Sequence, residues 1–448
     1  MLYEPYFATD EIGSIFSDRA TLQYLLDFEA ALARGQAAAG LIPKEAAAAI
    51  ATACRAELYD PASIAKAAAR GGSAAIPLVQ ALTGQVEGEA KRYVHWGATS
   101  QDTLDTASVL QQRRALIVIE RDLVRLARAL ATLATRHRDT VMAGRTWLQH
   151  ALPITFGLKA AGWLSFAARQ RRRLEELRPR LLVLQLGGAA GSLASLGDRG
   201  PAAIAAVARE LELGAPTLPW HSMRDRSAEA ASFLALLAGG LGKIARDVSL
   251  LMQTEIGEVA EKAESSAGGS STMPHKRNPA VSSAILAAAH SVPGLVATVM
   301  SAQIHEQERD GGAFHAEGRA LQEIYRLVGG ALANSVRLTE GLEIDAKRMR
   351  ANLDATHGLL MSEAVMMALG PSLGRLVAHD RVEAACRKAL AGGGTLVEAL
   401  AADKDIVRHL PRAELERLTE PAHYLGAARS FIDRALEEYA SAFPASPS

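Results

Sequence analysis

Residues Ser270–Pro279 read Ser-Ser-Thr-Met-Pro-His-Lys-Arg-Asn-Pro and follow Ala267-Gly268-Gly269, between two long helical patterns. The glycines permit a backbone with positive φ, and the prolines suit the first turn of the next helix. Lys276 and Asn278 would then lie near a helix N-terminus, where an anion is stabilised. Hydroxyls, a cation and an amide in one loop predict a binding site for a carboxylate. On composition alone, a flexible linker between helices is the alternative.

Helical periodicity dominates the rest of the chain. Apolar residues step by three and four from Leu116 to Leu133 and from Leu237 to Leu251, and strand-like alternation is nearly absent. The sequence therefore predicts an all-α protein whose long helices pack in a bundle. The expected long helices cover residues 103–138, 152–184, 224–262, 280–304 and 317–342.

Glycine and proline breaks divide the chain into three helical regions. Residues 1–97 and 345–448 carry shorter predicted helices, broken at positions such as Gly71-Gly72 and Gly370-Pro371. We therefore expect an N-terminal helical domain over 1–97, a central long-helix bundle over 98–344 and a C-terminal helical domain over 345–448.

Composition narrows the possible partners. The chain has 448 residues with 49 basic and 49 acidic side chains, so its formal charge is zero and nucleic acid is not an expected partner. Cys54 and Cys386 form neither a CxxC pair nor a zinc spacing, and residues 1–14 lack the apolar core of a secretory signal. We expect a cytoplasmic protein without a disulfide framework or a structural metal.

Residues 280–304 contain no Asp, Glu, Lys or Arg, and their length could span a bilayer. However, they include Ser282, His290 and a central Pro293, and much of their apolar character is alanine. We interpret this segment as a helix buried in a large bundle or between subunits, and we expect no membrane partner.

Two further loops are as rich in polar groups as the first. Residues His95–Asp102 place hydroxyls where a helix should start, although a plain helix cap at Ser100 or Asp102 explains that pattern too. Residues Gly144–His150 precede another expected helix, with Pro153 in its first turn. Here Arg145 could be a structural ion-pair partner and His150 an ordinary polar residue. Three such clusters, each at the end of a long helix, favour a functional site.

Arg224 and Arg226 stand at the start of an expected helix, where the helix dipole disfavours a cation. Anion recognition accounts for them, and so does an ion pair with Asp225 or Glu229. The run Gly187–Gly191 follows a helical pattern and lacks GxGxxG spacing, so we do not expect a dinucleotide site.

The segments His95–Thr106, Gly144–Gly157 and Gly268–Pro279 resemble, in this order, the three signature regions of the fumarase/aspartase superfamily. We call them the first, second and third segments. The resemblance implies a homotetramer around a bundle of twenty helices, with each active site assembled from three subunits. It implies a small polycarboxylate substrate and neither a cofactor nor a metal.

Within the superfamily, the chain resembles the bacterial cycloisomerase branch, which lactonises 3-carboxy-cis,cis-muconate in protocatechuate breakdown through the β-ketoadipate pathway. The residues that carry this resemblance lie in Gly72–Pro77, Tyr93–Asp102, Arg145–His150 and Ala313–Glu317. That branch usually has tryptophan where Phe314 and Gly318 stand. These two departures leave open a sulfomuconate or another related polyacid as the substrate.

Position 147 separates two classes of chemistry. By resemblance, adenylosuccinate and argininosuccinate lyases have a histidine there, which serves a nitrogen leaving group. Trp147 can donate a hydrogen bond but cannot transfer a proton at ordinary pH. An amine leaves poorly unless it is protonated, whereas a carboxylate, with a reference pKa of about 4, leaves as a stable anion. Trp147 therefore favours lactonisation over amine elimination.

The resemblance also implies roles for individual residues. Ser271 is the expected proton donor to carbon, and a loop oxyanion site or Lys276 would stabilise its alkoxide. Lys276 and Asn278 are expected to hold the activating carboxylate. His150 is expected in a catalytic role. The further residues expected to bind the substrate are His95, Thr99, Ser100, Arg145, Thr146, Trp147, Gln149, Arg224, Met273 and His315.

Two other functions stay open on the sequence. One is an elimination lyase of the adenylosuccinate or nitrosuccinate kind. The other is a non-catalytic helical scaffold, which does not account for Ser271, Lys276 and Asn278 occurring together.

Overall fold

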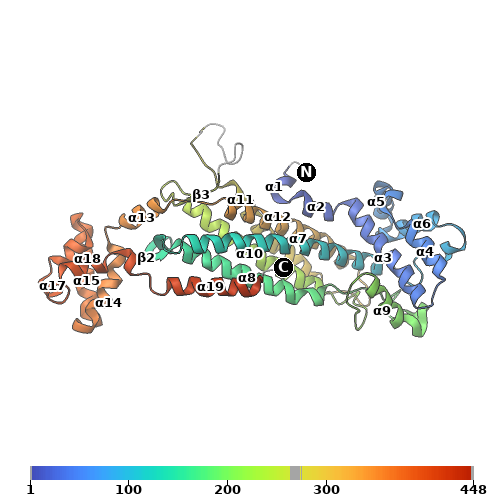
Figure 1. Cartoon of the computed structure of the whole chain (residues 1–448). Coiled ribbons are helices and arrows are strands. Elements are labelled where there is room, and N and C mark those ends of the chain that lie inside the picture. The colour runs from blue at the N-terminus through green and yellow to red at the C-terminus, as the bar shows by residue number, and fades with distance from the viewer. Residues whose placement is uncertain (1–2, 263–272, 274, 445–448) are drawn as a thin grey trace. The chain divides into compact units, whose positions relative to one another are not determined.

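The structure is a computed structural model that describes residues 3–262, 273 and 275–444. Helices dominate it, as the sequence predicts (Figure 1). The long helices that carry the predicted bundle are α7 (Ser100–Arg136), α8 (Phe156–Leu181), α10 (Asp225–Leu251), α11 (Ala280–Ser301) and α12 (Gly312–Glu340).

Shorter helices precede and follow this set. The N-terminal elements are α1 (Glu4–Phe7), α2 (Asp10–Ile15), α3 (Asp18–Ala38), α4 (Lys44–Ala53), η1 (Ala56–Leu58), α5 (Pro61–Gly71), α6 (Ala75–Gln85) and η2 (Gly88–Tyr93). Between α8 and α10 lie η3 (Ala194–Arg199) and α9 (Gly200–Glu210). The C-terminal elements are α13 (Ala346–Asp354), η4 (Leu359–Met361), α14 (Ser362–Leu373), α15 (Arg375–Gly392), α16 (Leu396–Ala401), α17 (Lys404–His409), α18 (Arg412–Leu418), η5 (Pro421–His423) and α19 (Ala428–Ala442).

Strands are few and short. β1 (Val141–Thr146) and β2 (Gln149–Thr155) form an antiparallel hairpin, and β3 (Val259–Ala260) pairs with β4 (Glu343–Ile344). The expected helix start at Pro153 is wrong, because Pro153 lies in β2 opposite Ala143 and α8 begins at Phe156. A proline is tolerated there because both strands of a two-stranded sheet are edge strands.

The chain divides into two compact units that do not follow sequence order. Unit 1 contains Met1–Leu123, Gln170–Gly242 and Ala284–Ser335, and unit 2 contains Val124–Arg169, Lys243–Ser283 and Val336–Ser448. Each long helix of the predicted bundle contributes one stretch to each unit. The three-domain division drawn from the sequence stays a prediction.

Apolar faces of neighbouring helices form the core of unit 1. One cluster joins α3, α4 and α6 through residues such as Leu26, Ile50 and Leu82. A second joins α3, α7 and α9 through Phe28, Leu110 and Val207. The predicted stripe on α7 is confirmed: its members are buried at every step, namely Leu116, Ile119, Leu123, Leu126, Leu130 and Leu133.

Unit 2 has its own core. The helices α14 to α18 enclose a cluster that includes Val365, Leu369, Leu396 and Leu400. The hairpin β1–β2 packs against α13 and η4 in the same unit. This packing fixes the second segment on a folded support.

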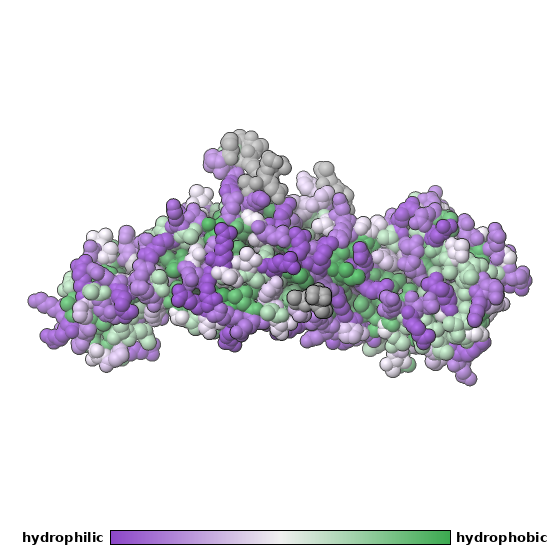
Figure 2. Space-filling model, in the orientation of Figure 1, coloured by the Kyte–Doolittle hydropathy of each residue, from purple (hydrophilic) through white to green (hydrophobic). Residues whose placement is uncertain are grey.

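Two described helices, α10 and α11, are long and apolar enough to cross a membrane by length and composition. In each helix, the most apolar stretch covers 18 residues. In α10, 61% of this stretch is buried, but in α11 only 28% is buried. α10 is thus a core helix of the single chain, whereas much of the uncharged α11 lies at the chain's surface. Apolar residues are also exposed on the face drawn in Figure 2.

Candidate active site

The first segment is organised by the carboxylate of Asp102, which is fully buried at the start of α7. The carboxylate accepts hydrogen bonds from the backbone N–H groups of Thr99, Gly187 and Gly188 at 3.0, 2.8 and 2.9 Å. It also lies 2.7 Å from Nε2 of His221. Asp102 does not cap α7 by accepting from its first turn: it lies within that turn and accepts from Thr99, which precedes the helix, and most of its partners belong to other parts of the chain.

The glycine-rich run Gly187–Gly191 supplies two of the backbone N–H groups that bind Asp102. Gly188 has φ of +66°, and a Cβ there would approach the carbonyl oxygen of Gly97 to 2.9 Å. Gly97 in turn has φ of +72°, and a Cβ there would meet Leu196 at 2.6 Å. Both glycines are therefore required for the close approach of the two loops.

Two hydroxyl residues end the first segment. Thr99 is partly buried, and its Oγ1 accepts a hydrogen bond from Nη1 of Arg309 at 2.9 Å. Ser100 begins α7 and is also partly buried. Both predicted substrate residues are therefore accessible in the single chain.

His95 is held by a buried acid. Its Nδ1 lies 2.8 Å from Oε1 of Glu29, an oxygen that also accepts a hydrogen bond from Thr103. Burial opposes the charged imidazole, but the Glu29 carboxylate outweighs burial, so the pKa of His95 is raised above its ordinary value. The positive φ of His95, +56°, places the ring at a sharp bend of the loop.

Arg224 is an interior ion-pair residue. Its side chain donates two hydrogen bonds to Asp105, both at 2.9 Å, and two to Glu317, at 3.0 and 2.6 Å. All three residues are buried. Burial raises the pKa of the Asp105 carboxyl in spite of its arginine partner. The expected surface pairs with Asp225 or Glu229 do not form; Glu229 pairs with Arg180 instead.

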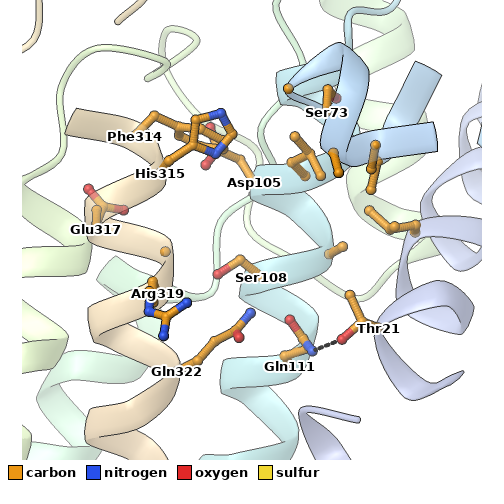
Figure 3. A pocket seen from close by; sticks show the side chains of 18 of the residues that line it. Thr21, Ser73, Asp105, Ser108, Gln111, Phe314, His315, Glu317, Arg319 and Gln322 are labelled. Carbon is orange, nitrogen blue, oxygen red and sulfur yellow. Dashed lines mark hydrogen bonds between the residues drawn. The ribbon is translucent and has the colours of Figure 1, made fainter. Parts of the chain in front are cut away.

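A cavity of about 650 Å³ lies between α7 and α12 in unit 1, next to this ion pair. Figure 3 shows Ser108 and Gln111 of α7 facing Arg319 and Gln322 of α12 across it. The predicted substrate residue His315 is exposed and lines the same cavity. Arg224 therefore forms part of the cavity wall while its charge is paired with Asp105 and Glu317.

The second segment is the hairpin β1–β2 in unit 2. Thr146 pairs with Gln149, and the turn between them consists of Trp147 and Leu148, with φ of +53° and +65°. Trp147 is 96% exposed and Leu148 is 75% exposed. Non-glycine residues in the left-handed region are strained, and such strain is typical of functional positions.

Arg145 has a structural ion-pair partner, which is one of the two roles that the sequence allows for it. Its guanidinium makes a bidentate pair with Glu258 at 3.0 and 2.6 Å, and Glu258 is fully buried. Asn352 donates a further hydrogen bond to Glu258 at 2.7 Å. The pair anchors the end of the hairpin next to its turn within unit 2.

His150 lies beside this pair, opposite Arg145 in the hairpin. Burial, with the positive charge of Arg145, lowers the pKa of His150. Its Nδ1 is buried and has no hydrogen-bond partner among the described residues. A neutral imidazole with an unused nitrogen is suited to accept or relay a proton.

The third segment lies only partly within the described residues, and Ser271 falls outside them. Met273 and Lys276 are exposed and Asn278 is partly buried, and the Lys276 N–H donates to the Met273 carbonyl at 3.0 Å. The helix that follows is fixed by Glu261, whose carboxylate accepts from the N–H groups of Val281 and Ser282 at 2.9 and 2.8 Å.

The predicted site residues fall into two groups. Unit 1 holds His95, Thr99, Ser100, Arg224 and His315. Unit 2 holds Arg145, Thr146, Trp147, Gln149, His150, Met273, Lys276 and Asn278. Their roles at a substrate stay predictions.

Sequence reasoning missed the acids that hold these residues. Glu29 and Glu258 are distant in sequence from the segments they fix, and Glu261 stands just before the third segment but outside it. A single sequence carries no signal for such pairing. Among the described residues, one group of potential metal ligands comes together, namely His379, Asp380 and Glu383. All three are exposed on α15, where charged side chains are ordinary surface residues, and we assign no metal site to them.

Comparison with known proteins gives two family matches. Residues 5–294 match the family described as lyase, and residues 358–435 match the adenylosuccinate lyase C-terminus.

Similar proteins match over nearly their whole lengths. The 3-carboxy-cis,cis-muconate cycloisomerase of Pseudomonas aeruginosa is 54% identical over 441 residues, which cover 98% of this chain and 96% of that protein. The crystal structure of the 3-carboxy-cis,cis-muconate lactonizing enzyme from Pseudomonas putida matches with a TM-score of 0.94 and 50% identity, over 98% of this chain and 99% of that one. The nitrosuccinate lyase of Streptomyces davaonensis is 46% identical, over 97% of this chain and 94% of that protein.

Replacing Arg224 with Met should leave Asp105 and Glu317 buried without a counter-charge. We expect the free energy of unfolding to fall by about 3–5 kcal/mol, measured by denaturant titration. The triple variant Arg224→Met, Asp105→Asn, Glu317→Gln should recover much of that loss because no unpaired charge remains. Equal stability of Arg224→Met and the unmodified protein would show that the buried pair contributes nothing.

The raised pKa of His95 predicts a pH-dependent contribution to stability. The charged pair with Glu29 stabilises the folded state fully below the ordinary histidine pKa of about 6.5, and this contribution is lost as the pH rises through the raised value. The difference in melting temperature between the unmodified protein and His95→Gln should therefore be largest near pH 6 and shrink toward alkaline pH. The exposed His409, changed to Gln, is the control and should show no such trend. A difference that grows with pH would contradict the assignment.

Proposed function

The chain belongs to the lyase family of the fumarase/aspartase superfamily, and on that premise we propose that it is a cycloisomerase that lactonises 3-carboxy-cis,cis-muconate. The observation that carries the proposal is the 54% identity to a cycloisomerase across nearly the whole of both chains. Trp147, which cannot supply a proton to a nitrogen leaving group, supports it on chemical grounds. The proposed setting is protocatechuate catabolism through the β-ketoadipate pathway.

The proposed reaction is an intramolecular addition. A carboxylate oxygen of the substrate attacks the far carbon of a conjugated double bond and forms the lactone C–O bond. The π electrons move onto the activating carboxylate, and the α-carbon then takes up one proton. Catalysis therefore requires a site that stabilises a growing negative charge and a donor placed at carbon.

We assign the proton transfer at carbon to Ser271. Lys276 and Asn278 bind the activating carboxylate, and both precede α11, whose N-terminus is fixed by Glu261. The cation of Lys276 favours the charge that develops on that carboxylate, since the carboxylate of Glu261 already occupies the first N–H groups of α11. Thr99 and Ser100 bind a second carboxylate, for which their accessible position at the start of α7 is suited.

His150 is the second catalytic residue in the proposal. Its lowered pKa keeps the ring neutral near pH 7, and its Nδ1 has no partner among the described residues. A neutral ring can accept a hydrogen bond from Ser271 or from the substrate and so orient the donor. The remaining residues of the second segment, Arg145 through Gln149, shape the site around the substrate, with Arg145 held by Glu258.

We propose a homotetramer with shared active sites. The observation that supports it is α11, which has no charged residue and is only 28% buried in its most apolar window. A helix of this kind needs an apolar partner, and a second copy of the same chain supplies one in a symmetric assembly. The proposed location is the cytoplasm, in keeping with the free Cys54 and Cys386.

A second candidate function is elimination from a succinate derivative, as the name of the Streptomyces relative describes. The 46% identity to that relative favours this candidate over a non-catalytic scaffold. Trp147 argues against release of an amine, but nitrite leaves as a stable anion, so Trp147 does not separate lactonisation from nitrosuccinate cleavage. Direct assays on both substrates separate them.

The purified protein, with no added cofactor, should consume 3-carboxy-cis,cis-muconate, as followed by loss of the conjugated ultraviolet absorbance. Adenylosuccinate and argininosuccinate should not be cleaved. Ser271→Ala should lower turnover by at least about a hundredfold if it transfers the proton, while folding stays intact. The exposed serine Ser430 of α19, changed to Ala, is the control. Efficient release of nitrite, AMP or arginine by the unmodified protein would replace the lactonisation proposal with an elimination lyase.

Light scattering should give a mass near four times the chain mass of 47.4 kDa. Ala297→Arg places a charge on the exposed face of α11, so it should break the assembly and abolish turnover together. Ala391→Arg, at an exposed position of α15, should change neither property. An active monomer would exclude shared active sites.

A further inference from the structure

Arg309 lies in the connection between α11 and α12 and contacts the first segment directly. Its Nη1 donates to Oγ1 of Thr99 at 2.9 Å. Its Nη2 donates to the carbonyl oxygens of Gly188 and Ala189 at 3.2 and 2.9 Å. The side chain thus joins a predicted substrate residue to the glycine-rich loop.

All three acceptors of Arg309 are neutral. Within the part of the chain that the structure describes, no carboxylate forms an ion pair with it, whereas Arg224 has two carboxylate partners and Arg145 has one. Arg309 is exposed, so water solvates its charge in the single chain. Its positive charge is therefore available to an anion that arrives at Thr99.

The guanidinium is also held in place before any ligand arrives. The carbonyls that bind it belong to Gly188 and Ala189, and the Gly188 N–H is bound by the buried carboxylate of Asp102. Gly188 cannot move away readily, because it packs against Gly97. A cation fixed in this way loses little conformational entropy when it binds an anion.

The contact also sets the direction of the Thr99 hydroxyl. A hydroxyl has one hydrogen to donate and two lone pairs. Since Oγ1 accepts from Arg309, its own hydrogen points elsewhere, and no acceptor for it occurs among the described residues. Thr99 is therefore prepared to donate a hydrogen bond to a negatively charged group.

We propose that Arg309 binds a substrate carboxylate together with Thr99 and holds the Thr99 hydroxyl in the donating orientation. This inference rests on the proposed function and adds a residue to it. A tricarboxylate substrate carries more negative charge than Lys276 alone can compensate. Arg309 supplies a second cation at a place where Thr99 and Ser100 supply hydroxyl donors.

The competing explanation is a purely structural clip between the two loops. A clip would stabilise the folded chain but would not contact the substrate. Loss of a clip should lower the melting temperature and leave KM unchanged. Loss of a carboxylate-binding residue should raise KM with a smaller effect on kcat.

Arg309→Met should raise KM for 3-carboxy-cis,cis-muconate at least tenfold, and Arg309→Lys should recover part of the loss because it keeps the charge. Thr99→Val should raise KM as well. The effect of the double variant should be smaller than the product of the two single effects, because both residues act on one carboxylate. Arg199→Met is the matched control, since Arg199 is an exposed arginine of the same unit that donates to the Gly40 carbonyl, and its KM should be unchanged.

Calorimetric titration with propane-1,2,3-tricarboxylate gives a readout that does not require turnover. The unmodified protein should bind this probe, and Arg309→Met should bind it at least tenfold more weakly. If the unmodified protein binds the tricarboxylate but does not lactonise carboxymuconate, the proposed function fails while the role of Arg309 stands. An Arg309→Met variant with unchanged KM and unchanged probe affinity, or with only a lower melting temperature, would overturn the inference.

Discussion

The buried carboxylate of Asp102 is the contact on which the first segment depends. It satisfies three backbone N–H groups, from Thr99, Gly187 and Gly188, and contacts the ring of His221. A charge taken out of water is tolerated only when its hydrogen-bonding capacity is used in this way. The start of α7, the glycine-rich loop and His221 are therefore fixed as one group. Arg309 and Thr99 are held in position by their contacts with this group.

Three arginines near the predicted site residues show how environment assigns different roles to one side chain. Arg224 is enclosed by Asp105 and Glu317 and lies over the rings of Trp220 and Phe314, at 5.1 and 5.5 Å. The bidentate partner of Arg145 is a buried acid. In both cases a carboxylate of the protein already compensates the charge, so these residues are suited to hold the site's shape. Among the residues that the structure describes, no carboxylate compensates the charge of Arg309, which is the condition for binding an anionic substrate.

The helices could be predicted from the sequence because the spacing of apolar residues that indicates a helix lies within the helix itself. The stripe from Leu116 to Leu133 repeats at helical spacing, and every member is buried. The hairpin could not, because its turn is Trp147-Leu148 rather than the Asn-Gly or Asp-Gly pair that signals a tight turn. By its local residues alone, the hairpin resembles a loop that leads into a helix.

The candidate site residues that lie in the three segments could be predicted from the sequence. The acidic residues that hold them in place could not. Glu29 is 66 positions from His95, and Glu258 is 113 positions from Arg145. Arg309 stands in the charged run Glu308-Arg309-Asp310, which is typical of an ordinary solvated turn. Its contacts with Thr99 and the glycine-rich loop depend on the folded arrangement of unit 1.

Several features of the single chain are costly unless another surface meets them. The turn at Trp147 and Leu148 adopts a strained backbone and exposes both side chains, although a glycine would relieve the strain. Most of the apolar window of α11 is unburied. Among the described residues, His150 Nδ1 and both ring nitrogens of His305 are buried without a hydrogen-bond partner. Each feature would be unfavourable in a protein that acts alone. Association of subunits can bury α11 and cover the turn, and the proposed shared site gives the neutral His150 ring a group to bind.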